Sequence, residues 1–363
     1  MSESTSEDRS LETNEPALPV LPDNLDDLLA MGQQYLDQQG FIEAQQVFEK
    51  ALTLEPANVV ARHNLGYAQE SQGLHEAAIA DYEAALQSPT PLAQSAFNLG
   101  VLLTRANRVD EARRAFEQVL TLEPTFANAW VNLGVLHARA GELTAARRCY
   151  EKALEMDPSC HSARLKRANV KARERRWEEA LADYAGLLEE GWNPAEVHYR
   201  RGLVLGAKGD EEDALRAYKQ AIAAASDHIA AHIQLALLYA QQEHYDQATE
   251  TLQQAASLAP DDARVQYNLG NMHARQAVEG GEILNYGYGD AAMRAYRRAI
   301  ELDPRFLKAR YNLACVAEKM SVQEGITSWE QYLEAARDVP AEQEWLVKAR
   351  RYLRTLKDAE AVS

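Results

Sequence analysis

The chain has 363 residues, of which 46% are hydrophobic and 26% are charged, an ordinary composition for a globular protein. Its net charge of −17 argues against general binding to nucleic acids or to membrane surfaces. No stretch reaches the roughly 18 apolar residues of a membrane helix, and the three cysteines show no metal-ligand spacing. We therefore expect a cytoplasmic protein that has no cofactor and no metal.

Residues 1–24 are rich in Ser, Thr, Glu and Pro, and Arg9 is their only basic residue. Such a segment has too little apolar surface to join a packed core. We expect a disordered acidic N-terminal segment, for which a role as a docking tail is an alternative.

A pattern of 34 residues then repeats along the chain, and it is clearest between residues 127 and 158. Gly134 is small where two helices must approach each other, and Tyr150 fills the space beside it. Gly141 ends the first helix, and Pro158 follows the end of the second. The same small and aromatic residues recur at equivalent positions without a slip in register: Gly32, Phe48, Gly66, Tyr82, Gly100, Phe116, Gly202 and Tyr218.

The fifth repeat departs from this pattern. Arg167 and Ala168 stand where Leu and Gly are usual. We predict that a neighbour supplies an acid to Arg167, or that packing there is loose. Seven basic residues lie between Arg164 and Arg176, but no aromatic residues are interleaved with them. A solvated or groove-facing helix is therefore favoured over a nucleic-acid site.

The eighth repeat contains ten extra residues around Val278 to Gly289, and the ninth contains two near Gly325. We expect the longer insert to be a loop whose Tyr286 and Tyr288 could contact a partner; a neutral surface insertion is the alternative. After Pro340 one more helix follows, with its apolar residues on one face, as an end cap requires. These residues are Trp345, Leu346, Ala349, Leu353 and Leu356.

The spacing resembles that of the tetratricopeptide repeat family over residues 25–340. The resemblance implies an all-α, right-handed α-solenoid superhelix of about nine helix–turn–helix repeats, with residues 341–363 as capping helix and tail. It also implies that the first helix of each repeat lines a concave groove, with repeat positions 2, 5, 6, 9, 12 and 13 facing it.

Asparagine is frequent at these positions, although it is a poor former of helix interiors. A carboxamide both donates and accepts hydrogen bonds, so a ladder of carboxamides can bind the backbone of an extended peptide. The pattern resembles the asparagine ladders of O-GlcNAc transferase and kinesin light chain; ordinary repeat consensus is the alternative. The candidate groove residues are Asn64, Asn98, Asn132, Lys166, Asn169, Arg200, Gln234, Asn268, Asn271 and Asn312.

Position 13 is repeatedly basic and makes the predicted groove positive inside an acidic protein. Guanidinium groups pair well with carboxylates, so we expect an acidic peptide ligand; capping of helix ends is the alternative. The family's clamp for chaperone C-termini is not expected, because Leu165 replaces its lysine. The position-13 candidates are Arg105, Arg139, Arg173 and Arg275, with Lys319 in the last repeat.

No group of residues has the spacing of a catalytic or metal site. We therefore predict a non-enzymatic adaptor or scaffold that binds an acidic or extended segment of a partner protein, and neither nucleic acid nor a membrane. Two alternatives stay open: a scaffold that assembles with copies of itself, and a subunit that positions substrates for a separate enzyme.

Overall fold

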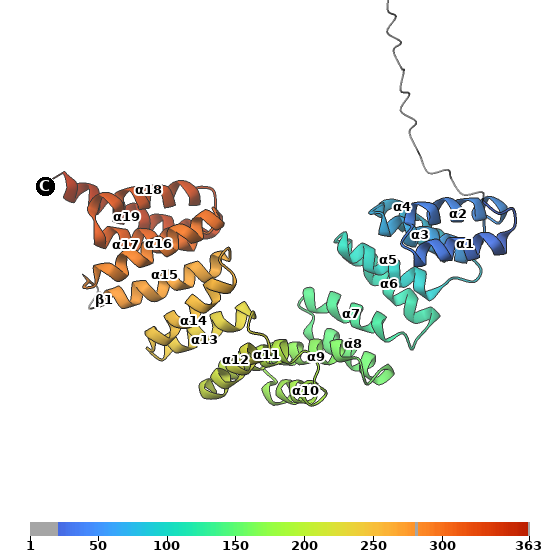
Figure 1. The fold of residues 1–363 in the computed structure, drawn as a ribbon, viewed down its shortest axis with the longest axis horizontal. Coiled ribbons are helices and arrows are strands. Elements are labelled where there is room, and N and C mark those ends of the chain that lie inside the picture. The colour runs from blue at the N-terminus through green and yellow to red at the C-terminus, as the bar shows by residue number, and fades with distance from the viewer. Residues whose placement is uncertain (1–20, 280–281, 362–363) are drawn as a thin grey trace, which may run out of the picture. The chain divides into compact units, whose positions relative to one another are not determined.

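The structure is a computed structural model that describes residues 21–279 and 282–361. In this part of the chain, nineteen α-helices follow one another as nine helix–turn–helix pairs and a final single helix (Figure 1). The predicted all-α repeat fold is confirmed. Of the predicted disordered segment, residues 1–20 lie outside the described residues, while Asp23 forms an ion pair with Lys50 of the second helix.

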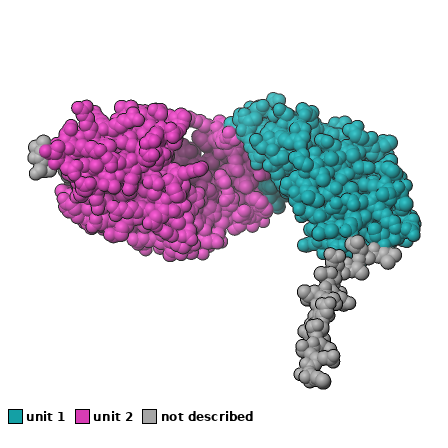
Figure 2. Space-filling model, turned by 90° about the horizontal axis from the view of Figure 1, so that it is seen from above, with its two compact units in different colours: residues 1–163 teal, residues 164–363 magenta. Residues whose placement is uncertain are grey.

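The chain divides into two compact units, residues 1–163 (unit 1) and 164–363 (unit 2), which Figure 2 colours separately. Unit 1 contains the first four helix pairs, each helix lying against the next. Their bounds are α1 Leu25–Asp37, α2 Phe41–Leu54, α3 Val59–Ser71, α4 His75–Leu86, α5 Ala93–Arg105, α6 Val109–Leu122, α7 Ala127–Arg139 and α8 Leu143–Met156.

Unit 2 contains the remaining helices, except that α9 begins three residues before the boundary. A two-stranded antiparallel hairpin and a 3-10 turn interrupt the helical order. The bounds are α9 His161–Arg173, α10 Trp177–Glu189, α11 Pro194–Lys208, α12 Glu211–Ala224, α13 Ile229–Gln241, α14 Tyr245–Leu258, α15 Ala263–Ala277, β1 Val278–Glu279, β2 Glu282–Ile283, α16 Tyr286–Leu302, α17 Leu307–Met320, α18 Val322–Ala336, η1 Pro340–Glu342 and α19 Gln343–Glu360.

Local residue chemistry accounts for where the helices begin and end. Asn24 and Asn58 accept a hydrogen bond from a backbone N–H in the first turn of α1 and α3, as N-cap residues do. Gly141 follows α7 with a φ of +80°, a conformation that glycine adopts without strain. The helix end predicted at Gly141 is therefore confirmed.

In six of the nine described helix pairs, a glycine of the first helix closely contacts an aromatic ring of the second. A Cβ atom on Gly134 would lie 2.5 Å from Tyr150 Cε1, and one on Gly202 would lie 2.5 Å from Tyr218 Cε1. The rings themselves are buried. Only glycine lets the first helix approach this closely, so the spacing of glycine and aromatic residue along the sequence defines the helix pair.

The fifth repeat replaces part of this apolar core with charges. Asp183 accepts hydrogen bonds from Arg167 Nε at 3.0 Å and from Lys171 Nζ at 2.9 Å. The side chains of Asp183, Lys171 and Arg167 are 9%, 10% and 22% exposed. Burial of the cations is offset by the shared carboxylate. The acid predicted beside Arg167 is therefore present.

Two further basic residues, one in α9 and one in the following turn, also have acidic partners. Arg164 pairs with Glu190, and Arg176 forms two hydrogen bonds with Glu179. These pairs neutralise much of the positive charge that nucleic-acid binding requires.

The insert is not a loop, and that prediction was wrong. Val278–Glu279 and Glu282–Ile283 form the hairpin, and Tyr286 and Tyr288 lie in the first turn of α16. Ile283 is buried, and Tyr288 stacks on His273 with a ring separation of 5.9 Å. The described residues of the insert bury apolar surface against α15 of their own repeat and against α17 of the next.

The final helix covers the end of the last repeat. Leu346 and Ala349 are buried, and Leu353 and Leu356 pack against the same cluster. Trp345, at the edge of this face, is 42% exposed and contacts Tyr311 edge to face. The helix thus packs with the predicted face while leaving one aromatic residue partly in solvent.

Candidate functional site

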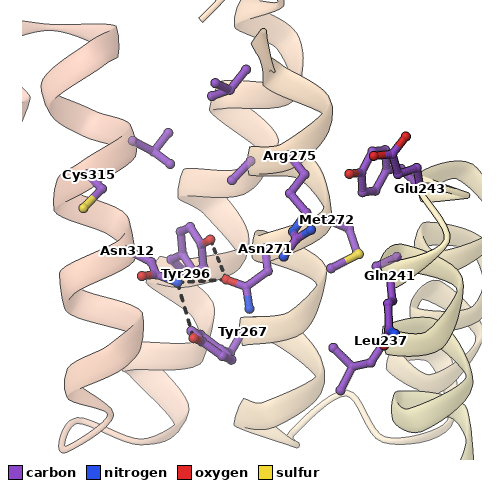
Figure 3. Close-up of a pocket in the computed structure, with 15 residues that line it drawn as sticks. Leu237, Gln241, Glu243, Tyr267, Asn271, Met272, Arg275, Tyr296, Asn312 and Cys315 are labelled. Carbon is purple, nitrogen blue, oxygen red and sulfur yellow. Dashed lines mark hydrogen bonds between the residues drawn. The ribbon is translucent and has the colours of Figure 1, made fainter. Parts of the chain in front are cut away.

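A pocket of about 900 Å³ lies in unit 2, among the first helices of its last three repeats (Figure 3). Residues of α13, α15 and α17 form its walls, and Tyr296 of α16 and Val278 of β1 complete it. Three of the predicted groove residues line it, namely Asn271, Arg275 and Asn312. The hairpin therefore borders this pocket directly.

A hydrogen-bond network crosses the wall of the pocket, shown as dashed lines in Figure 3. Asn271 Oδ1 accepts from the Tyr296 hydroxyl at 2.8 Å and from Asn312 Nδ2 at 2.9 Å. Asn312 Nδ2 also donates to the Tyr267 hydroxyl at 3.3 Å. Burial raises the pKa of Tyr296, which keeps its hydroxyl protonated as a donor.

The remaining lining is largely apolar. Leu237, Met272 and Val316 contribute to it, and Met272 is fully buried. Cys315 also lines the pocket, but burial raises the pKa of its thiol to about 12. A thiol with that pKa is protonated at neutral pH and is a poor nucleophile. The pocket can bind a ligand through polar and apolar contacts, and its cysteine is unsuited to catalysis.

The other predicted residues of unit 2 lie outside this pocket, and three of them form hydrogen bonds or ion pairs elsewhere. Asn169 accepts from the Tyr184 hydroxyl at 2.7 Å, which repeats the contact between Asn271 and Tyr296. Arg200 is paired with Glu196 at 2.6 Å. Asn268 donates a hydrogen bond to the Arg264 carbonyl of its own helix. Gln234 lines a second pocket of about 220 Å³. Lys166 and Arg173 lie on α9.

In unit 1 the predicted asparagines are used in several ways. Asn98 Nδ2 donates to the Tyr82 hydroxyl of the preceding repeat at 3.3 Å, while Asn132 Nδ2 donates to a carbonyl of its own helix. Asn64 is half-buried. Arg105 pairs with Glu70 at 3.0 Å, and Arg139 is exposed in the last turn of α7. Linking adjacent repeats is thus one reason for asparagine at this position.

The sequence analysis missed Tyr267, Gln241 and the hydroxyl of Tyr296 as parts of the site. Tyr267 and Gln241 occupy repeat positions 5 and 13, so the repeat register could have identified them. Tyr296 stands at the repeat position of Tyr150, which by itself indicates only a ring that fills space between two helices. Its ring is buried against Gly270 while its hydroxyl reaches Asn271, a double role that spacing alone does not reveal.

Within residues 21–279 and 282–361, no helix is long and apolar enough to cross a membrane. No group of three or more His, Cys, Asp or Glu side chains in these ranges could hold a metal ion.

Family comparisons agree with the repeat pattern. One tetratricopeptide repeat model matches residues 29–94, 97–159, 139–194 and 165–229, and a second matches residues 207–270. The matches of the first model alone span more than half of the chain. No curated protein sequence matches the chain significantly.

Several solved structures share the fold at low sequence identity. A tetratricopeptide repeat protein from Parabacteroides merdae is 19% identical, covers 68% of this chain and 98% of its own, and has a TM-score of 0.52. PilF from Pseudomonas aeruginosa is 22% identical, covers 57% and 94%, and has a TM-score of 0.49. YrrB, described as a TPR protein with an unusual peptide-binding site, is 23% identical, covers 54% and 95%, and has a TM-score of 0.39. The first of these structures supports the repeat fold, and identities below 25% show nothing about ligands.

Proposed function

Because the chain belongs to the tetratricopeptide repeat family, we propose that it is a non-enzymatic adaptor that binds an extended, acidic segment of a partner protein along the first helices of its repeats. Proteins of this family generally act in protein–protein interactions. The observation that carries the proposal is the unit 2 pocket, whose polar network and Arg275 lie on the first helices themselves.

The chemistry of this pocket suits a peptide better than a compact apolar ligand. Amide and guanidinium groups lie beside the apolar Leu237 and Met272, so both the backbone and the side chains of a peptide find partners. The three cysteines are free, and we place the protein in the reducing cytoplasm as part of the same proposal.

The test is to capture partners from a native lysate on the full-length protein. A groove variant changes Asn98, Asn132, Asn271 and Arg275 to alanine, and a matched control changes four exposed residues of second helices: Arg114, Glu117, Gln220 and Gln253. Retained proteins are identified by mass spectrometry, and their binding segments are mapped on overlapping peptides.

We expect the wild-type protein and the control to retain the same partner, and the groove variant to lose it with unchanged helicity. Equal retention by all three proteins would contradict binding along the first helices. Retention of this chain alone would favour a self-assembling scaffold, which light scattering of the purified protein would then measure.

A further inference from the structure

The unit 2 pocket contains two neighbouring hydrogen-bond donors that have no acceptor among the described residues. Asn271 Oδ1 accepts two hydrogen bonds, which fixes the orientation of the amide. Its Nδ2 group is therefore the one left for a ligand. In the described part of the chain, nothing accepts a hydrogen bond from it.

Arg275 stands four residues later on the same face of α15. It lines the pocket, is exposed, and forms no hydrogen bond or ion pair with any described residue. Figure 3 shows its guanidinium group beside Asn271. Other arginines on first helices differ from Arg275 because they form ion pairs. Arg105, Arg200 and Arg264 each have a carboxylate partner.

We propose that Asn271 and Arg275 form a subsite for a carboxylate group of the extended partner segment, an inference that rests on the proposed function above. A guanidinium fork and an amide NH₂ together supply only donors, and a carboxylate supplies only acceptors. Leu237, which is 38% exposed, lies in the same lining and favours an apolar residue near the acid.

The same surroundings disfavour a phosphate group. Glu243 lines the pocket at the turn after α13 (Figure 3). It would repel the double charge of a phosphate more strongly than the single charge of a carboxylate. The carboxylate can belong to an Asp or Glu side chain or to a chain terminus, and the test separates these two sources.

The probes are three libraries of acetylated octapeptides, randomised over neutral residues. The first has Glu at position five and an amidated C-terminus, the second has Gln there and is also amidated, and the third has Gln and a free C-terminus. Each library is passed over the immobilised full-length protein, over the Arg275→Gln variant and over Arg264→Gln. Arg264 is the matched control, because it lies on the same helix, carries the same charge and is already paired with Asp262.

We expect the wild-type protein to retain the Glu library about tenfold more than the amidated Gln library, as a charge-assisted pair implies. Arg275→Gln should abolish this preference, and Arg264→Gln should keep it. If the third library behaves like the Glu library, a chain terminus also supplies the carboxylate.

Equal retention of the Glu and amidated Gln libraries by wild type, or an unchanged preference in Arg275→Gln, would overturn the subsite. Either result would leave binding along the first helices standing, because peptides would still be retained. Failure of the wild-type protein to retain any library would count against both proposals.

Discussion

The two units consist of the same repeat but differ in net charge and in the polarity of their cores. Unit 1 contains 24 acidic and 11 basic residues, which gives a net charge of −13. Unit 2 contains 31 acidic and 27 basic residues, which gives a net charge of −4. The repeats of unit 1 step by 34 residues and have apolar cores. Unit 2 contains the buried ion cluster, the hairpin and the polar pocket.

The third and fifth repeats make the difference concrete. Leu99, Leu103 and Ala115 are buried in the third repeat, and Arg167, Lys171 and Asp183 occupy the same positions in the fifth. The repeat therefore accepts either an apolar trio or a charged one, provided that the charges compensate each other.

The largest effect is expected from Asp183→Asn. It leaves the cations of Arg167 and Lys171 without their shared anion and should lower the free energy of unfolding by about 3 kcal/mol. Urea-induced unfolding measures the change. The control Asp213→Asn removes an exposed ion pair with Arg216 and should change stability by less than about 1 kcal/mol.

A triple variant exchanges the charged trio of the fifth repeat for the apolar trio type of the third. The triple variant Arg167→Leu, Lys171→Leu and Asp183→Ala should be about as stable as the wild-type protein or more stable. A loss as large as that of the single variant would show that the charges are indispensable to the packing of unit 2.

A smaller effect is expected from Gly134→Ala in unit 1. The new methyl group would meet the Tyr150 ring at 2.5 Å and should lower stability by about 1–3 kcal/mol. The same substitution at Gly206 of unit 2 meets atoms only at 3.9 Å. There it should raise stability by about 0.5–1 kcal/mol, since alanine favours the helix. Thermal unfolding of the two variants should therefore shift in opposite directions.

Removing one hydroxyl group should have a still smaller effect on stability. Tyr296→Phe deletes the hydrogen bond to Asn271 and should lower stability by about 1 kcal/mol. Tyr82→Phe in unit 1 deletes the hydrogen bond that the hydroxyl accepts from Asn98 and the one that it donates to Glu70, and should lower stability by about 1–2 kcal/mol. Only Tyr296→Phe should also weaken the preference for the Glu library, because it frees the Asn271 amide to turn. Equal preference in the two variants would contradict this positioning role.

The smallest effect is a gradual loss of stability in acid. Burial lowers the pKa of His63 in unit 1 and of His273 in unit 2. The unfolded chain therefore takes up protons first, so stability is complete above about pH 6.5 and falls as the pH drops below it. Replacing both residues by glutamine should flatten this dependence in denaturation midpoints measured from pH 8 to 5. Exposed His75→Gln is the control.

The repeats could be predicted from the sequence alone. The glycine, aromatic and proline positions recur at a fixed spacing, and each acts within one helix pair. Local packing of this kind is periodic, so helix limits such as Gly141 could be predicted from it. The final helix could also be predicted, because its apolar residues recur at the spacing of one helix face.

Which polar side chains remain free to bind a ligand depends on the tertiary structure. Asn312 meets Asn271 across 41 residues of sequence, and Asp183 reaches Arg167 across 16. Such contacts depend on the distance between neighbouring helices, which the packing of whole repeats sets and composition does not. The candidate donors could therefore be predicted from the sequence. The fold separates Arg275, which has no carboxylate partner among residues 21–279 and 282–361, from Arg105 and Arg200, which have one.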